Sequence, residues 1–135
     1  MIDLSNFNDL VSRTGSTGMN KSYIRIGDNE CKLILGDKHA KEVRQYLGNT
    51  LNVKVSGDLE YIVLMRGNDR RLSNDRSVSI FSLRQQYKEK FGDSIKFIHL
   101  DVSWDEDERG VKVLVLHWNG KKEYAADMTI HKLKG

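Results

Sequence analysis

The feature that most limits the fold is a run of short elements in residues 32–66. Residues 32–35 are typical of a strand, residues 37–47 have the apolar spacing of a helix capped by Asp37, and residues 51–55 and 60–65 form a hairpin pattern. Gly48 follows the helix pattern, where a left-handed residue often ends a helix. Elements this short bury little surface alone, so they must share a core with the rest of the chain.

The following part of the chain repeats this order of elements. Residues 78–81 indicate a short strand, Ser82 is placed to cap a helix that ends at residue 91, and residues 95–104 and 111–118 form a longer hairpin. Aligning Gly48 with Gly92, an offset of 44 residues, pairs apolar positions: Val43 with Tyr87, Leu47 with Phe91, Leu51 with Ile95 and Val53 with Phe97. We therefore predict an α+β fold in which two similar strand-helix-hairpin halves form one mostly antiparallel sheet or barrel-like core.

The 135 residues have the length of one domain. We divide it into residues 1–20, with a short helix over 6–13 and a flexible connection, a first half over 21–66, a basic linker over 67–75, and a second half over 76–135. The first half opens with a strand at residues 23–26. Near the end of the chain, Asn119-Gly120 is a strong signal for a two-residue turn, so residues 121–130 are expected to add another antiparallel strand.

Composition excludes several classes of protein. No apolar run approaches the roughly 18 residues of a membrane span, and the first residues lack the order of a secretion signal, so we expect a cytoplasmic protein without a membrane partner. Cys31 is the only cysteine and is expected to be a core or strand residue. The four histidines lack metal-ligand spacing, and we expect no metal and no cofactor. His99, Asp101 and His117, on the two arms of the second hairpin, are the one set of candidate catalytic residues. We expect that the protein is not an enzyme.

Basic residues give the leading functional hypothesis. The chain carries 22 Lys and Arg against 19 Asp and Glu, a net charge of +3, and four arginines fall within residues 66–76. Arginine binds phosphates and reads guanine edges. We expect a non-enzymatic DNA-binding protein, such as a transcriptional regulator, that contacts the phosphates of duplex DNA through the basic loop between the halves. The candidate residues are Arg25, Lys32, Arg66, Arg70, Arg71, Arg76 and Arg84. The alternative is a solvated linker in which these arginines pair with Asp69 and Asp75.

An acidic run supports a second hypothesis. Asp105, Glu106, Asp107 and Glu108 form the tip of the second hairpin. Such a tip can imitate nucleic acid, and the chain would then be a small protein of a phage or mobile element that binds and inhibits another protein, for example a host defence or nucleic-acid-processing complex. Solubility alone also accounts for a charged hairpin tip.

The helix that ends in Tyr46-Leu47-Gly48 and leads into a hairpin is similar to the AbrB-type swapped-hairpin module of bacterial transition-state regulators and antitoxins. The resemblance spans residues 24–65 and, more faintly, residues 76–118, where Phe91-Gly92 is the counterpart. It implies two units interlaced into one barrel that docks basic residues into DNA, through Arg25 and Lys32 in the first unit and Arg76 in the second. The chain would then be a monomer with pseudo-twofold symmetry, and a homodimer is the other expected state.

Overall fold

The computed structural model describes residues 20–125, and the helix expected at residues 6–13 lies outside that range. The described chain is α+β, with eight strands joined in one sheet. The elements in chain order are β1 (Ser22–Gly27), β2 (Glu30–Ile34), α2 (Asp37–Tyr46), β3 (Thr50–Val55), β4 (Tyr61–Arg66), β5 (Arg70–Arg71), β6 (Ser77–Ser79), the 3-10 helix η1 (Phe81–Leu83), α3 (Arg84–Phe91), β7 (Ile95–Glu106) and β8 (Lys112–Tyr124).

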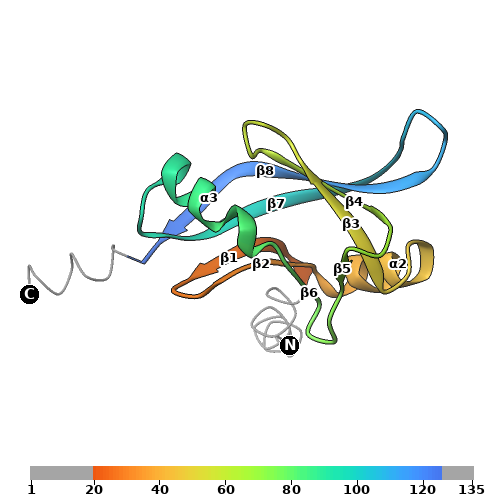
Figure 1. Cartoon of the computed structure of the whole chain (residues 1–135), viewed down its shortest axis with the longest axis horizontal. Helices are drawn as coiled ribbons and strands as arrows, with labels where there is room; N and C mark the ends of the chain where they lie inside the picture. The colour runs from red at the N-terminus through yellow and green to blue at the C-terminus, as the bar shows by residue number, and fades with distance from the viewer. Residues whose placement is uncertain (1–19, 126–135) are drawn as a thin grey trace, which may run out of the picture.

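The sheet is nearly closed on itself. Its strand order is β5-β3-β4-β8-β7-β1-β2-β6, and all the pairings are antiparallel. The long hairpin of β7 and β8 runs across the width of the molecule (Figure 1). The two strands at the ends of the order approach one another where Arg70 Nη1 donates a 2.9 Å hydrogen bond to the Ser79 carbonyl oxygen. The predicted α+β class with a mostly antiparallel, barrel-like sheet is confirmed.

Alternation along the strands sets the inside and the outside of this barrel. Residues at every second position point inward and are buried, because one face of each strand packs on the core. Both helices add apolar side chains to that core, Val43 from α2 and Tyr87 from α3. The inward residues include Ile24, Ile26, Cys31, Leu33, Leu51, Ile62, Leu64, Val78, Ile98, Leu100, Leu114 and Leu116. Cys31 is a core residue, as expected, and burial raises the pKa of its thiol to about 12.

The C-terminal ends of the two helices agree with the sequence prediction, and their N-terminal ends do not. Gly48 and Gly92 have φ of 95° and 111°, as expected for residues that end a helix. The two predicted N-terminal caps are wrong. Gly36 holds the capping position of α2 without a side-chain bond, which places Asp37 inside the helix, and Ser82 lies in η1. The Ile80 amide still donates to the Cys31 carbonyl oxygen of the sheet, and the 3-10 turn begins at the next residue, so the chain leaves the sheet through this tight turn.

The turn predicted at Asn119-Gly120 is also wrong. β8 continues through these residues as a bulge: Trp118 pairs with Leu100 and Lys122 with Ile98, so the β8 residues between them oppose a single residue of β7. Gly120 supplies the left-handed conformation, with φ of 90°. The residues after the bulge stay paired with β7 and do not start a new strand.

The expected linker at residues 67–75 contains the short strand β5. It pairs with β3, where Arg71 lies opposite Thr50 and Arg70 opposite Leu51. The side-chain oxygen of Asn52 accepts the amides of residues 68 and 69 at 3.2 Å each and so turns the chain back along β3. The basic segment is therefore fixed to the sheet.

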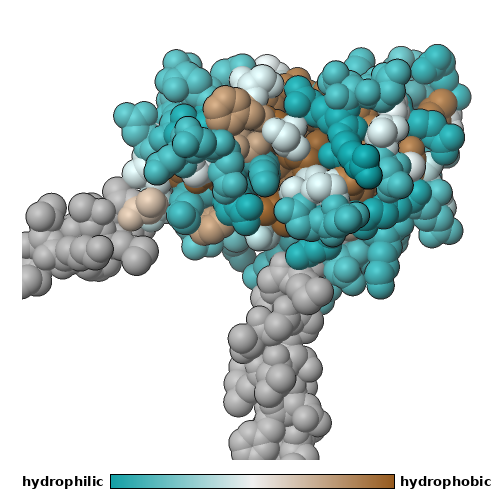
Figure 2. Space-filling model, turned by 60° about the horizontal axis from the view of Figure 1, so that its bottom comes forward, coloured by the Kyte–Doolittle hydropathy of each residue, from teal (hydrophilic) through white to brown (hydrophobic). Residues whose placement is uncertain are grey.

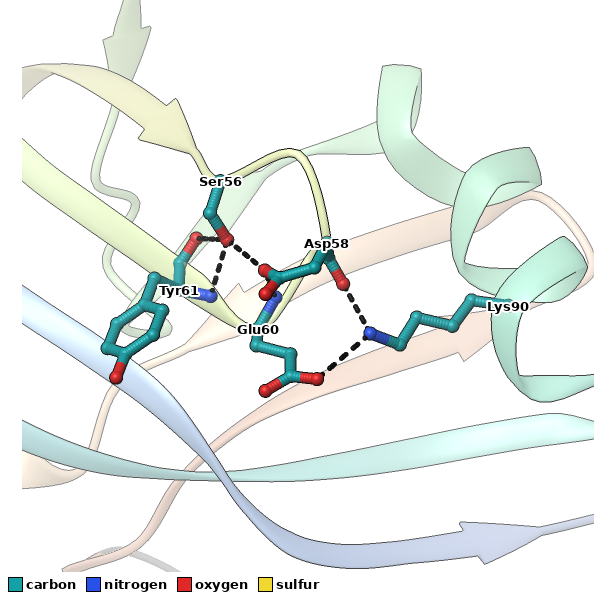
Figure 3. A network of polar contacts seen from close by, with 5 residues as sticks. All are labelled: Ser56, Asp58, Glu60, Tyr61 and Lys90. Atoms are coloured by element: carbon teal, nitrogen blue, oxygen red, sulfur yellow. Dashed lines mark hydrogen bonds and ion pairs between the residues drawn. The ribbon is translucent and has the colours of Figure 1, made fainter.

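A lysine of α3 holds the turn of the first hairpin (Figure 3). The Lys90 Nζ donates to the Asp58 carbonyl oxygen and lies 3.2 Å from Glu60 Oε2. The Asp58 carboxylate accepts hydrogen bonds from the Ser56 hydroxyl at 2.6 Å and from the Glu60 amide at 3.0 Å, and these bonds hold its pKa below the ordinary value. Helix α3 of the second half thus fastens the β3–β4 turn of the first.

Over the described range, the chain has no helix with the length and apolar character to cross a membrane.

Candidate nucleic-acid interface

A row of basic side chains runs across β1 and β2 on the outer face of the barrel and ends at the seam between β6 and β5. Because Ile24 and Ile26 point into the core, Arg25 between them points outward. Arg25 pairs in register with Lys32 of β2, and Lys32 pairs with Ser79 of β6. Arg70 of β5 then reaches the Ser79 carbonyl oxygen from the other side. Strand pairing therefore brings Arg25 and Lys32 together on the outer face, and Arg70 ends the row at the seam, where it lies opposite the buried Leu51.

Two acidic residues partly balance this row. The Arg25 Nε lies 2.7 Å from Glu30 Oε2, and the Arg70 Nε lies 3.5 Å from Asp69 Oδ2. Both arginine side chains remain about one-third exposed, at 35% and 31%. A guanidinium carries five N–H donors, so each arginine keeps donors that these contacts do not use. The row can therefore still accept phosphate oxygens.

The other predicted basic residues have separate positions. Arg71 is exposed on β5, beside Arg70. Arg76 has a φ of 67° and donates from Nη1 to the Leu35 carbonyl oxygen at 2.7 Å, next to the end of β2. Arg84 donates from Nε to the Gly27 carbonyl oxygen at 2.8 Å, and Arg66 donates to the carbonyl oxygen that ends α2. Arg66, Arg76 and Arg84 therefore contribute to the fold as well as to the surface charge.

The acidic tip predicted as the alternative site lies at the end of the β7–β8 hairpin. Asp105, Glu106 and Glu108 are exposed there. Asp107 differs, because its Oδ1 accepts the amides of Arg109 and Val111 at 2.8 and 2.9 Å, and these bonds hold its pKa below the ordinary value. One of the four carboxylates therefore shapes the turn, and the other three face solvent.

The histidines of the second hairpin have different partners. His99 Nε2 lies 2.7 Å from Glu123 Oε2, whereas the His117 ring stacks on Tyr61 with centroids 4.2 Å apart. Asp101 lies opposite His117 in register and close to Asn119. Within residues 20–125, the structure has no group of three or more His, Cys, Asp and Glu side chains placed to hold a metal ion.

Sequence reasoning missed an aromatic cluster beside the basic row. Tyr23 lies two residues before Arg25 on the same face of β1, and Phe97 and His99 lie opposite Arg25 and Tyr23 on β7. The alternation of residues 22–27 and 95–100 carries the signal for their outward direction, but only the pairing of β1 with β7 brings them together. On the side of the molecule that Figure 2 displays, hydrophilic residues surround a smaller apolar area.

Comparison of the chain with protein-family models, with curated proteins and with solved structures gave no match.

Proposed function

We propose that the chain is a non-enzymatic DNA-binding protein and that the outer face of β1, β2, β6 and β5 contacts the nucleic acid. The observation that carries this proposal is the row formed by Arg25, Lys32 and Arg70, with exposed Arg71 beside it. Arg25 and Lys32 lie outside the charged run that contains Arg70 and Arg71, and the pairing of β2 with β6 brings the two groups together.

The geometry of the row suits a phosphate backbone. Neighbouring strands lie about 4.8 Å apart, so the cations of Arg25 and Lys32 have a spacing comparable to that of charges along nucleic acid, and Ser79 separates Lys32 from Arg70. The arginines bring planar, multidentate donors, and Lys32 brings a point charge. Asp75 lies close enough to Lys32 for the lysine to help lower the pKa of that carboxyl, so the lysine also experiences some attraction within the protein. Binding is then electrostatic and sensitive to salt.

The proposal includes a duplicated architecture. Each half runs strand, strand, helix, strand, strand, and the two second strands, β2 and β6, pair with each other, as do the two last strands, β4 and β8. The Leu35 amide donates to the Arg76 carbonyl oxygen, and the Ile80 amide donates to the Cys31 carbonyl oxygen. These two hydrogen bonds flank the Leu33–Val78 pair, which is where a pseudo-twofold axis between β2 and β6 would pass. The resemblance to two AbrB-type modules in one chain agrees with this arrangement.

Charge reversal tests the proposed face. We expect Lys32→Glu with Arg71→Glu to abolish the electrophoretic shift of a DNA fragment at low salt. Lys54→Glu is the matched control, because Lys54 is an exposed lysine on β3, outside the row. An unchanged shift in the double variant, or an equal loss in the control, would overturn the assignment of this face. The absence of a shift by the unmodified protein would overturn DNA binding itself.

A further inference from the structure

The aromatic cluster on the outer face has the form of a stacking platform. The Tyr23 and Phe97 rings meet edge to face with centroids 5.7 Å apart, and the His99 ring lies 6.3 Å from Tyr23. All three side chains are partly exposed on the outside of the barrel, although aromatic rings are more often buried. Partly exposed rings on a sheet surface are available to stack on planar ligands.

Cations surround these rings. The Lys96 Nζ lies 5.7 Å from the centre of the Phe97 ring, and Arg25 lies directly opposite Phe97 in register. Glu123 of β8 lies opposite Phe97 and contacts His99 Nε2 at 2.7 Å, so one carboxylate also borders the rings. The platform therefore combines aromatic rings with the positive charges of Arg25 and Lys96.

An open groove of about 560 Å³ continues from His99 between β7, the start of β1 and α2. A cavity of this size is in the usual range for sites that bind small molecules or single nucleotides. Its walls offer amides, a hydroxyl, imidazoles and ammonium groups, together with the carboxylates of Asp101 and Glu123. The β8 bulge supplies one wall, so the irregularity at Asn119-Gly120 creates part of the groove.

His39 adds a polar atom that the fold does not use. Its Nδ1 is buried and has no hydrogen-bond partner among the described residues. Burial is the main cause that lowers the pKa of this imidazole below its ordinary value of 6.5, so the ring is neutral at pH 7. A neutral imidazole offers both a donor and an acceptor, which suits the edge of a base better than a second fixed charge would.

We infer that this face binds single-stranded nucleic acid, with bases stacked on Tyr23 and Phe97, one base edge in the groove, and phosphates held by the surrounding lysines and Arg25. The inference rests on the proposed function and makes it more specific. In a duplex the bases are stacked on each other and paired, so exposed rings gain little from them, whereas unpaired bases can leave their own stack for an aromatic side chain. The rings therefore favour single-stranded over duplex nucleic acid, a preference that the basic row alone would not give.

Fluorescence anisotropy with a labelled oligothymidylate, alone and annealed to its complement, tests this inference. We expect the single strand to bind about tenfold more tightly than the duplex. Tyr23→Ala and Phe97→Ala should each lower the single-strand affinity by about fivefold or more, whereas Tyr23→Phe retains it. Tyr46→Ala is the matched control, because Tyr46 is 39% exposed and lies at the end of α2, away from the platform.

A Phe97→Trp variant gives a direct signal from the platform. Its added indole fluorescence should be quenched by the oligothymidylate beyond any change in the parent protein, because a stacked base contacts the ring. Equal or tighter duplex binding, with no effect of the Tyr23 and Phe97 variants, would overturn the single-strand inference and leave DNA binding standing. No binding of either form at low salt would instead overturn the proposed function.

Discussion

Arg70 Nη1 donates a 2.9 Å hydrogen bond to the carbonyl oxygen of Ser79, and this contact joins the two end strands of the sheet. The residue has two roles in the account, since it closes the barrel and extends the basic row. Arg71, its exposed neighbour on β5, has only the second. The pair therefore allows the structural and the binding contributions to be separated.

We predict that Arg70→Ala lowers the free energy of unfolding by about 1 kcal/mol, the usual contribution of one such hydrogen bond. Arg71→Ala should change it by less than about 0.5 kcal/mol, as is usual for an exposed substitution. Both variants should bind DNA more weakly. Urea denaturation and an electrophoretic shift measure the two quantities, and equal destabilisation by the two variants would show that the seam contact does not close the barrel.

Lys90 gives a second prediction about stability. Its ammonium group donates to the Asp58 carbonyl oxygen and approaches Glu60 (Figure 3). It also lies 5.5 Å from the centre of the Phe91 ring. Lys90→Met keeps much of the apolar stem and removes the charge, so we expect a loss of about 1 kcal/mol in thermal or urea unfolding. Lys96→Met is the control, because Lys96 is exposed and contacts a single ring. A loss of similar size in the control would contradict the importance of the contact with the turn.

The turn between β5 and β6 predicts a pH dependence. Hydrogen bonds from the hydroxyls of Ser73 and Ser77 lower the pKa of Asp75 from 3.8 to about 2. A carboxyl whose pKa is depressed in the folded state stabilises that state above its unfolded pKa, and this stabilisation is lost as the pH falls. Stability should therefore decrease between about pH 4 and pH 2.

Asp75→Asn tests the origin of that decrease. The variant should be less stable than the parent at neutral pH and should show a shallower loss between about pH 4 and pH 2, measured by thermal unfolding across that range. Asp58 and Asp107 also have lowered pKa values, so part of the slope will remain. A variant with the full slope of the parent would show that Asp75 is not one of the groups responsible.

The acidic tip of the β7–β8 hairpin separates the two hypotheses drawn from the sequence. Reversing the exposed charges with Asp105→Lys and Glu108→Lys should leave DNA affinity unchanged or slightly higher, because the tip lies apart from the basic row. Asp107 is left intact, since its carboxylate binds two amides of the turn. Loss of DNA binding in this variant, with an unchanged melting temperature, would place the tip in the interface.

Local patterns in the sequence predicted much of the fold. Alternation located β1, and the turn signals and Gly48 located α2 and the first hairpin to within one or two residues. The misses occurred where tertiary pairing overrides a local signal. Asn119-Gly120 has the chemistry of a turn, yet the residues after it gain more by staying paired with β7, and the chain accommodates the excess as a bulge.

The candidate site was only partly predictable, for a similar reason. Charge density identified the segment that contains Arg70, and strand positions made Arg25 and Lys32 candidates, but nothing local indicates that Ser79 lies between Lys32 and Arg70. The rings of Tyr23 and Phe97 were overlooked because an aromatic residue at either position is typical of an ordinary strand. Only the antiparallel pairing of β1 with β7, about 75 residues apart in the sequence, makes them one cluster.

The salt dependence of nucleic-acid binding tests the central claim most directly. Each phosphate neutralised by a cation contributes a slope of about −0.7 for a single strand or −0.9 for a duplex to the plot of log affinity against log salt concentration. The row of Arg25, Lys32 and Arg70 with Arg71 predicts a total slope of about −3, which Lys32→Ala should make shallower by nearly one. A slope near zero, or one that Lys32→Ala leaves unchanged, would contradict binding through this face.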